Sequence, residues 1–211
     1  MTGSTAEQGD SVPHFLYLVR HGEHRDAEHG VDDGPLSERG IRQANAIGER
    51  LRGVQFSNAF HSPLERASET ARVMGGVMPD VDFEPHSLLM DCIPTGPESD
   101  PPVAYRSFFS GVTDAEAEAG RAQMADAVNR WIRSKTSDSN ELLVTHNFVI
   151  AWFVRHVLDA PDWKWMGLNT ANGGLTIIRL RSGRPAQLVA YNDLGHIAPE
   201  DRTGLSVPHT V

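Results

Sequence analysis

Two stretches of this chain share one pattern, a short apolar run that leads into a histidine. "HFLYLVR" (14–20) is followed at once by His21, and "NELLVTH" (140–146) ends on His146. Short and nearly continuous apolar runs are typical of central strands in a parallel sheet, which are buried on both faces. In open α/β sheets, ligands bind at the carboxyl ends of the strands. The pattern therefore predicts an α/β fold with two histidines at its ligand-binding edge.

The rest of the chain alternates between helical and extended patterns. The expected helices cover 36–53 with Ser37 as N-cap, 63–76 opened by Pro63, 115–135 and 148–158, and the expected strands cover 54–62, 81–89, 173–180 and 186–192. The last two strands should form a hairpin. This order predicts a three-layer α/β/α sandwich with a mostly parallel central sheet and an antiparallel edge strand.

Length and composition limit the domain organisation and the location. A chain of 211 residues fits one domain, expected at 14–198 between a flexible lead-in at 1–13 and a flexible tail at 199–211. The net charge of −9 argues against a general binder of nucleic acid or anionic membranes. The single cysteine excludes an internal disulfide, and no apolar run has the length of a membrane helix. A soluble, cytoplasmic protein is therefore expected.

Five side chains are expected to meet at the carboxyl edge of the sheet: Arg20, His21, Arg66, Asp91 and His146. Their chemistry suits phosphoryl transfer. Two guanidiniums bind a phosphoryl group and neutralise its charge. One neutral imidazole attacks phosphorus, and the other donates a hydrogen bond to the oxygens that gain charge. A carboxylic acid protonates the leaving oxygen, an effect worth about 10²–10⁴-fold in rate. This chemistry needs no metal and no cofactor.

The histidine-rich loop after the first strand is a candidate for a metal site. His21, His24, Asp26 and His29 lack the spacing of a helix-borne His-x-x-x-His pair, and no cysteines add ligands. No metal is therefore predicted.

Three segments resemble the signature segments of a known family. "LVRHGE", "HSPLERASETA" and "LLVTHNFVI" look like those of the histidine phosphatase superfamily, which has the phosphoglycerate-mutase-like fold, and the resemblance runs from about residue 14 to about residue 195. It implies that His21 is the phosphorylated nucleophile and that Arg20 and Arg66 bind the phosphoryl group. It also implies that His146 completes the pocket. The family's proton donor is usually a glutamate, whereas "LLMDC" supplies Asp91.

The segment "SLLMDCIPTGPESDPP" (87–102) narrows the resemblance to one branch. It is similar to the branch of the mitochondrial phosphoglycerate-mutase-like serine/threonine protein phosphatases. The resemblance implies a metal-independent phosphatase acting on a phosphoprotein or on a small phosphomonoester. A phosphoglycerate mutase is the second reading, although the short segment after Asp91 argues against the closed pocket that it needs. A catalytically weak phosphate-binding module is the third.

Further residues are expected to contact the substrate. Gly22, His24 and Asn147 are the candidates beside the two arginines, and Asn172 is a further candidate for lining the pocket. The expected partner is a phosphorylated substrate, with neither nucleic acid nor membrane. The sequence is also compatible with a homodimer formed through apolar residues around Trp152 and 163–166.

Overall fold

A six-stranded sheet forms the centre of the computed structural model, which describes residues 12–25 and 33–205. The strands are β1 (His14–Arg20), β2 (Asn58–His61), β3 (Phe83–Pro85), β4 (Ser139–Thr145), β5 (Leu175–Arg181) and β6 (Arg184–Asp193). Their order across the sheet is β3-β2-β4-β1-β5-β6. Because β3, β2, β4 and β1 pair in parallel, their carboxyl ends lie along one edge.

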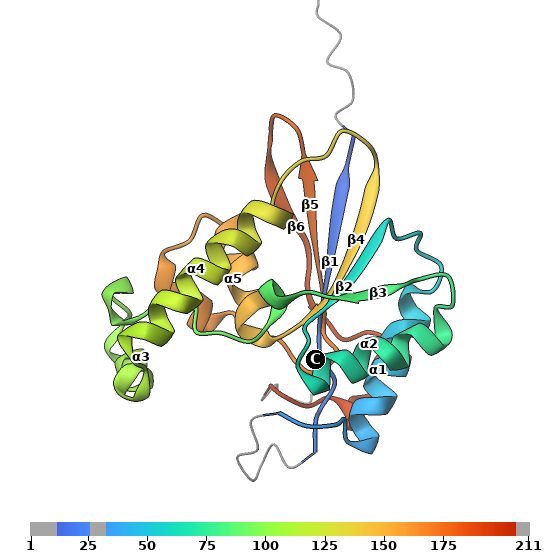
Figure 1. Cartoon of the computed structure of the whole chain (residues 1–211), viewed down its shortest axis with the longest axis horizontal. Coiled ribbons are helices and arrows are strands. Elements are labelled where there is room, and N and C mark those ends of the chain that lie inside the picture. The colour runs from blue at the N-terminus through green and yellow to red at the C-terminus, as the bar shows by residue number, and fades with distance from the viewer. Residues whose placement is uncertain (1–11, 26–32, 206–211) are drawn as a thin grey trace, which may run out of the picture.

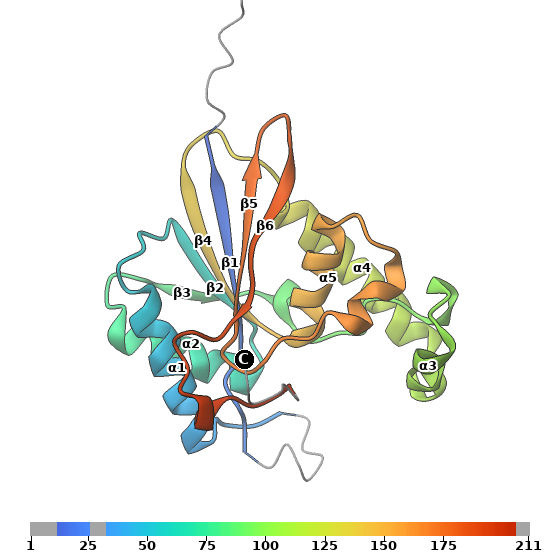
Figure 2. The same cartoon turned by 180° about the vertical axis from the view of Figure 1, so that it is seen from behind.

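Helices cover both faces of this sheet. They are α1 (Glu38–Leu51), α2 (Glu65–Val77), α3 (Val103–Arg106), α4 (Asp114–Trp131) and α5 (Asn147–Val157). Helices α1 and α2 lie on one side, α4 and α5 lie on the other, and the short α3 projects outward beyond α4 (Figures 1 and 2). The predicted three-layer α/β/α class is confirmed. No helix in the described ranges combines the length and apolarity that crossing a bilayer requires.

The antiparallel part of the sheet differs in one detail from the prediction. The strand that runs against β1 is β5, which is second from the edge, and β6 reverses again to run in the direction of the four parallel strands. The two strands form the expected hairpin. Gly183 in its turn adopts a φ of +67°, a conformation that glycine reaches without steric cost.

On each face of the sheet, strand and helix side chains pack together in an apolar cluster. Leu143 of β4 packs in the cluster on the α4 and α5 side, and its neighbours Leu142 and Val144 pack on the α1 and α2 side. All three side chains are fully buried. Successive residues of a strand point to opposite faces, so a strand covered on both sides must be apolar at every position. This explains the continuous apolar runs in the sequence.

Helix starts were predicted at Ser37 and at Pro63, and the structure confirms the first of them. Ser37 caps α1 as predicted, and its Oγ accepts a hydrogen bond from the N–H of Gly40 at 3.0 Å. Pro63 was expected to open α2, but the N-cap is Leu64 and the first helical residue is Glu65. Leucine has no side-chain acceptor for the free N–H groups of the first turn, so they need acceptors from elsewhere in the chain.

Several predicted elements are shorter than expected, among them the strand expected at 54–62, which covers only Asn58–His61. The strand expected at 81–89 covers only Phe83–Pro85 and gives way to a 3₁₀ helix at Ser87–Leu89. The ladder makes one more backbone bond, from the N–H of His86 to the carbonyl of His61 at 2.8 Å, before the chain turns into the 3₁₀ helix. The helix expected at 115–135 spans Asp114–Trp131, with Met124 and Trp131 buried on the predicted face.

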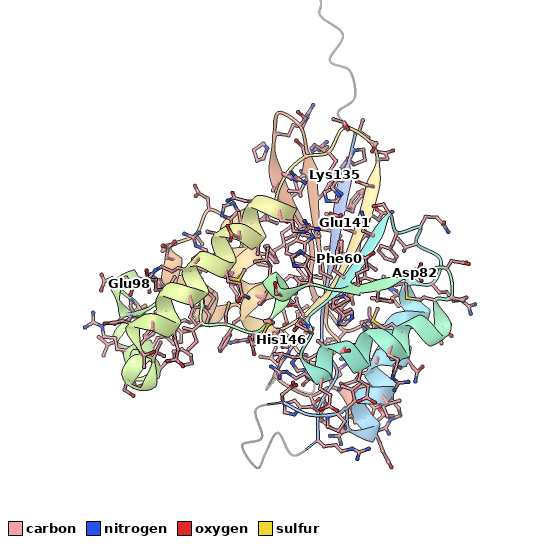
Figure 3. All side chains as sticks on the ribbon, in the orientation of Figure 1. Phe60, Asp82, Glu98, Lys135, Glu141 and His146 are labelled. Carbon is pink, nitrogen blue, oxygen red and sulfur yellow. The ribbon has the colours of Figure 1, made fainter. Side chains whose placement is uncertain are left out.

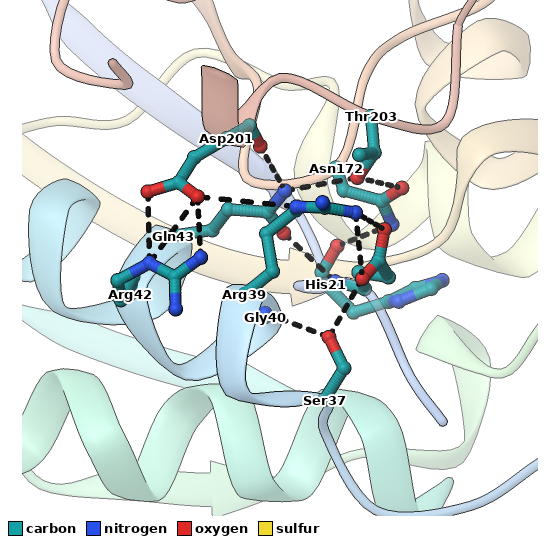
Figure 4. Close-up of polar contacts among 10 residues, drawn as sticks. His21, Ser37, Arg39, Gly40, Arg42, Gln43, Asn172, Asp201 and Thr203 are labelled. Atoms are coloured by element: carbon teal, nitrogen blue, oxygen red, sulfur yellow. Dashed lines mark hydrogen bonds and ion pairs between the residues drawn. The ribbon is translucent and has the colours of Figure 1, made fainter. Parts of the chain in front are cut away.

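The described part of the C-terminal segment packs against the domain. Asp201 accepts two hydrogen bonds from Nε of Arg42 and one from Nη2, and its backbone oxygen accepts one from Nε2 of Gln43 at 2.6 Å (Figure 4). Residues 199–205 of the segment expected to be a flexible tail thus make side-chain contacts with α1. The remainder of that tail, and the lead-in up to residue 11, lie outside the described residues.

Candidate active site

The carboxyl ends of three adjacent parallel strands bring the predicted site residues together. The N–H of His21, directly after β1, donates to the carbonyl of Thr145 in β4 at 2.9 Å. The N–H of Ser62, directly after β2, donates to Val144 at 2.9 Å. The His21 and His146 rings lie 5.1 Å apart between centroids, and Figure 3 shows His146 at this end of the sheet. The convergence expected from the strand order is present.

His21 is held in one tautomer. Its ring is 4% exposed, and its Nδ1 lies 2.8 Å from the carbonyl oxygen of Gly22, which can only accept a hydrogen bond. Nε2 accepts from Nε of Arg66 at 3.2 Å. The proton therefore sits on Nδ1, and Nε2 is unprotonated, with its lone pair directed at Arg66. Burial and the nearby His146 and Arg20 hold the pKa of His21 well below its usual range, so the ring is neutral at physiological pH.

Arg66 uses all three edges of its guanidinium. Besides the bond from Nε to His21, Nη2 donates to Asp91 at 3.2 Å and Nη1 donates to Asp33 at 2.9 Å. The side chain leaves the first turn of α2 and is only 6% exposed. One turn further along α2, the hydroxyl of Thr70 donates to the backbone carbonyl of Arg66 at 2.7 Å.

Arg20 reaches the same pocket from β1 and is anchored by backbone oxygens. Its Nη1 donates to the carbonyl of Thr170 at 2.5 Å and to that of Gly204 at 3.1 Å. Its Nε is buried without a hydrogen-bond partner among the described residues. Burial lowers the pKa of Arg20 to about 10, which leaves the guanidinium charged.

His146 follows β4 and is fully buried. Its Nε2 lies 2.8 Å from the hydroxyl of Ser62, while its Nδ1 is 3.9 Å from Oδ2 of Asp91 and has no hydrogen bond within the described part of the chain. Burial, together with the charges of Arg66 and Arg20, lowers its pKa well below the usual value. The ring is therefore a neutral hydrogen-bonding group beside the nucleophile.

Asp91 is delivered by the 3₁₀ helix that replaces the predicted strand. Thr145 donates its hydroxyl to the Leu89 carbonyl at 2.7 Å, and Gln123 of α4 donates to the Met90 carbonyl at 2.7 Å. The carboxyl keeps 37% of its side chain exposed, so it can meet a substrate. Burial raises the pKa of Asp91, and the charges of Arg66 and Arg20 only partly oppose that rise.

These surroundings suit a phosphoryl group. The guanidinium of Arg66 donates to the neutral Nε2 of His21, and the charge of Arg20 helps to lower the pKa of the same ring. Two further nitrogens, Arg20 Nε and His146 Nδ1, are buried without hydrogen-bond partners in the described ranges. Leaving buried polar groups unpaired is costly. An anion with several acceptor oxygens would satisfy the arginine donors and bring phosphorus to the lone pair of His21.

The three expected substrate contacts lie in different positions. His24 is half-buried, with its ring 6.1 Å from that of His21. The N–H of Gly22 donates to Thr70, and a Cβ on Gly22 would lie 2.6 Å from the Gly40 carbonyl, so this glycine permits close packing against α1. Asn147 also has a supporting position, as its hydrogen bonds show.

Asn147 uses both ends of its amide on the loop before β5. Its Oδ1 accepts from the N–H of Thr170 at 2.8 Å, and its Nδ2 donates to Asn169 at 2.7 Å. It therefore holds the backbone carbonyl that anchors Arg20. Asn172 supports the nucleophile in a similar way, because its Nδ2 donates to the His21 carbonyl at 3.1 Å (Figure 4).

Sequence reasoning missed three groups: Asp33, Ser62 and Thr70. Ser62 and Thr70 fall within the "HSPLERASETA" segment and contact His146 and Gly22, so their proximity to a recognised motif was an available signal. Asp33 lies 33 positions before Arg66 in a stretch without periodicity, and no local signal marks it.

The described residues contain no group of three or more His, Cys, Asp or Glu placed to share a metal ion. Asp26 and His29, which were weighed as ligands, lie outside the described ranges. The absence of a metal stays a prediction.

Curated relatives cover most of this chain. It is 28% identical over 192 residues to "Serine/threonine-protein phosphatase Pgam5, mitochondrial" of Caenorhabditis briggsae, over 87% of this chain and 64% of that protein. The human protein of that name, PGAM5, is 27% identical over 190 residues, over 89% of this chain and 65% of the relative. The chain thus spans less than two thirds of the length of these relatives.

Solved structures share the fold at lower identity. A phosphoglycerate mutase from Bacillus anthracis superposes with a TM-score of 0.69 at 19% identity, over 89% of this chain and 96% of that one. A putative alpha-ribazole-5'-P phosphatase from Escherichia coli superposes with a TM-score of 0.67 at 24% identity, over 85% and 96%. These likenesses show the phosphoglycerate-mutase-like fold.

The predicted location needs a correction. A cytoplasmic protein was expected from the composition of the sequence, yet the curated relatives are named as mitochondrial. That finding overturns the cytoplasmic assignment. Compositional rules for targeting segments are weak evidence of location, because the segments vary widely in sequence.

A family model agrees with the motifs and with the fold. The model of the histidine phosphatase superfamily, branch 1, matches residues 16–92 and 103–194. These ranges contain His21, both arginines, Asp91 and His146. Because this match covers well over half of the 211 residues, the chain belongs to the histidine phosphatase superfamily.

Proposed function

We propose that this protein is a metal-independent phosphatase that hydrolyses phosphomonoesters through a phosphohistidine at His21. The observation that carries the proposal is the state of that ring. Its Nδ1 proton is held by the Gly22 carbonyl, and its unprotonated Nε2 lies 3.2 Å from Nε of Arg66. A neutral, oriented imidazole beside fixed positive charges is suited to attack a bound phosphoryl group.

The first half of the reaction transfers the phosphoryl group. The lone pair of His21 Nε2 forms a bond to phosphorus, and the bond from phosphorus to the leaving oxygen breaks with its electron pair on that oxygen. The oxygen takes the proton of the Asp91 carboxyl, so an alcohol leaves and Asp91 becomes a carboxylate. Arg20 and Arg66 stabilise the negative charge on the phosphoryl oxygens.

The second half restores the enzyme. A water molecule attacks the phosphorus of the phosphohistidine, and its proton goes to the Asp91 carboxylate. The nitrogen–phosphorus bond breaks with its electron pair returning to Nε2, and inorganic phosphate leaves. Asp91 thus acts as acid and then as base at the same position.

The substrate class includes both phosphoproteins and small phosphomonoesters. The relatives named serine/threonine-protein phosphatases favour a phosphoserine or phosphothreonine side chain as substrate. The neighbour named a putative alpha-ribazole-5'-P phosphatase favours a small metabolite, although its 24% identity is evidence of fold only.

The test compares wild type, His21→Ala and Asp91→Asn on p-nitrophenyl phosphate and on a phosphoserine peptide, with EDTA present. We expect turnover by wild type and none by His21→Ala. Asp91→Asn should lose far more activity on the peptide than on p-nitrophenyl phosphate, because p-nitrophenolate leaves without protonation. Undiminished turnover by His21→Ala would refute the proposal.

The same assay separates two rival functions. A phosphoglycerate mutase would interconvert phosphoglycerates and release little inorganic phosphate. A phosphate-binding module would bind the phosphopeptide without turning it over. Release of phosphate from the peptide excludes both.

A further inference from the structure

Asp33 joins the start of α2 to the phosphate pocket. Its Oδ2 accepts from the N–H of Glu65 at 2.9 Å, and its Oδ1 accepts from the N–H of Arg66 at 3.3 Å. These are first-turn donors of a 13-residue helix whose N-cap, Leu64, makes no side-chain cap. The carboxylate thus supplies from a distant segment the cap that the local sequence lacks.

A cap alone does not account for the second role of the same oxygen. Oδ1 also accepts from Nη1 of Arg66 at 2.9 Å, as an ion pair in which the arginine side chain is 6% exposed. The other side of that guanidinium binds Asp91 through Nη2 at 3.2 Å. One arginine therefore bridges two carboxylates, of which Asp91 is the proton donor in the function proposed above.

Geometry links these contacts. The guanidinium is planar, with its donors in a rigid fork, so fixing one edge fixes the directions of the others. With Nη1 held by Asp33, Nε points at His21 and Nη2 points at Asp91. Without the Asp33 carboxylate, the guanidinium plane of Arg66 would no longer be held in a fixed orientation at the start of α2.

Asp33 and Asp91 are also linked by charge, through Arg66. The described groups that face Asp91 are Arg66 from α2, Arg20 from β1 and His146 at the start of α5. Burial opposes ionisation of Asp33, but the N–H groups of Glu65 and Arg66 lower its pKa and keep it a carboxylate. Its negative charge offsets part of the pull that Arg66 exerts on the proton of Asp91.

We propose that Asp33 is a positioning residue that divides Arg66 between two carboxylates, holding the guanidinium at His21 and leaving Asp91 able to carry the proton that it donates. This inference deepens the phosphatase function proposed above and rests on its assignment of Asp91 as the donor. Asp33 touches neither nucleophile nor donor and acts on both through Arg66.

The direct test is a pH titration of the Asp91 carboxyl by carbon NMR in wild type and Asp33→Asn, with the signal assigned by its loss in Asp91→Asn. Asparagine keeps an acceptor for the helix and removes the charge. We expect the pKa of Asp91 to fall by about 0.5–1 unit in Asp33→Asn. Asp33→Glu, which keeps the charge, should restore the wild-type titration.

Kinetics give a second readout. On a phosphoserine peptide, the alkaline limb of kcat for Asp33→Asn should move to lower pH by the same amount, because the donor loses its proton earlier. On p-nitrophenyl phosphate, where the leaving group needs no proton, this shift should be much smaller.

Thr113→Ala is the matched control. Thr113 caps α4 by accepting from Glu116, and it has no contact with the pocket. It should reduce thermal stability and leave the Asp91 titration unchanged. An unchanged Asp91 titration in Asp33→Asn would overturn the inference and leave Asp33 as a helix cap. Absence of wild-type turnover would instead refute the phosphatase function, since the titration does not depend on turnover.

Discussion

His21 and Asp91 must hold opposite protonation states, and their surroundings provide for both. His21 must be neutral to attack, and burial with neighbouring positive charge keeps its pKa well below 6.5. Asp91 must carry a proton to donate it, and burial raises its pKa above 3.8. At the residue scale, the pocket lowers the pKa of its nucleophile and raises that of its proton donor.

The pH dependence follows from these two directions. As pH falls, activity should persist below 6.5, because His21 is protonated only well below that value. As pH rises through the raised pKa of Asp91, kcat/KM on a phosphoserine peptide should decline. The measurement is the pH profile of kcat/KM on that peptide and on p-nitrophenyl phosphate. An acid limb centred at or above pH 6.5 would contradict the account of His21.

Sequence reasoning placed the residues that sit beside a strand end. Arg20, His21 and His146 stand at the ends of apolar runs, Arg66 lies in the first turn of the next helix, and their meeting required only the strand order. Sequence reasoning could not predict that Asp33 belongs to the site. A carboxylate in an aperiodic loop has no local pattern, and its partner lies on a helix whose start was itself misplaced at Pro63.

At the scale of elements, the segment at 199–205 is part of the pocket. Gly204 accepts from Arg20 and has a φ of +79°, and the N–H of Asn172 donates to the Thr203 carbonyl at 2.9 Å. Gln43 of α1 donates to Thr203 Oγ1 at 2.9 Å (Figure 4). The segment therefore links α1 to the anchor of Arg20.

Gly204→Ala should weaken substrate binding. A Cβ there would collide with Oδ1 of Asn172 and lie 2.9 Å from Nη1 of Arg20, so the arginine must move. We expect kcat/KM to fall about tenfold, or about 1.4 kcal/mol, mainly through KM. The assay is steady-state kinetics on p-nitrophenyl phosphate.

Gly183→Ala is its control, because Gly183 also has a positive φ, of +67°, and a Cβ there meets nothing within 4 Å. It should cost about 1 kcal/mol of stability and leave kcat/KM unchanged. Equal kinetic losses in both variants would mean that the effect of Gly204 is backbone strain alone.

Strands and helices were predictable to the extent that periodicity encodes them. β1 was placed at its observed limits, because one buried strand has one continuous apolar run. The structure of the stretch at 81–89 and of the segment at 199–205 could not be predicted from periodicity. Both are fixed by contacts from distant residues, such as Thr145 on Leu89 and Arg42 on Asp201, which no local pattern contains.

At the scale of the whole molecule, the sheet has a second polar centre far from the pocket. Glu141 binds Lys135 at 2.7 Å and Asn58 at 3.1 Å, and lies 3.4 Å from Nε2 of the fully buried His14. Figure 3 shows Lys135 and Glu141 towards the end of the sheet opposite His146. Burial opposes ionisation of Glu141, but the bonds that it accepts from His14 and Lys135 lower its pKa to about 2.

Glu141→Gln should therefore destabilise the fold in a pH-dependent way. A depressed pKa stabilises the folded state above the ordinary value of 4.5, and this contribution is lost as pH falls towards about 2. We expect a loss of about 3 kcal/mol at pH 7, measured by urea unfolding, that shrinks steadily below pH 4.5.

Glu49→Gln is the comparison, because Glu49 pairs with Arg52 on the surface at 3.2 Å with half of its side chain exposed. Such pairs contribute at most about 1 kcal/mol, so this variant should stay close to wild type at every pH. A loss in Glu141→Gln that does not change with pH would exclude the ionised carboxylate as its cause.

The central claim is a covalent phosphohistidine at His21, and trapping it is the most direct test. Asp91→Asn, which lacks the carboxylate that activates water, would be mixed with p-nitrophenyl phosphate, quenched in alkali and analysed by peptide mass spectrometry. The account predicts one phosphoryl group on the peptide containing His21, stable to alkali and lost in acid. Turnover without any such adduct, or the same adduct in His21→Ala, would contradict it.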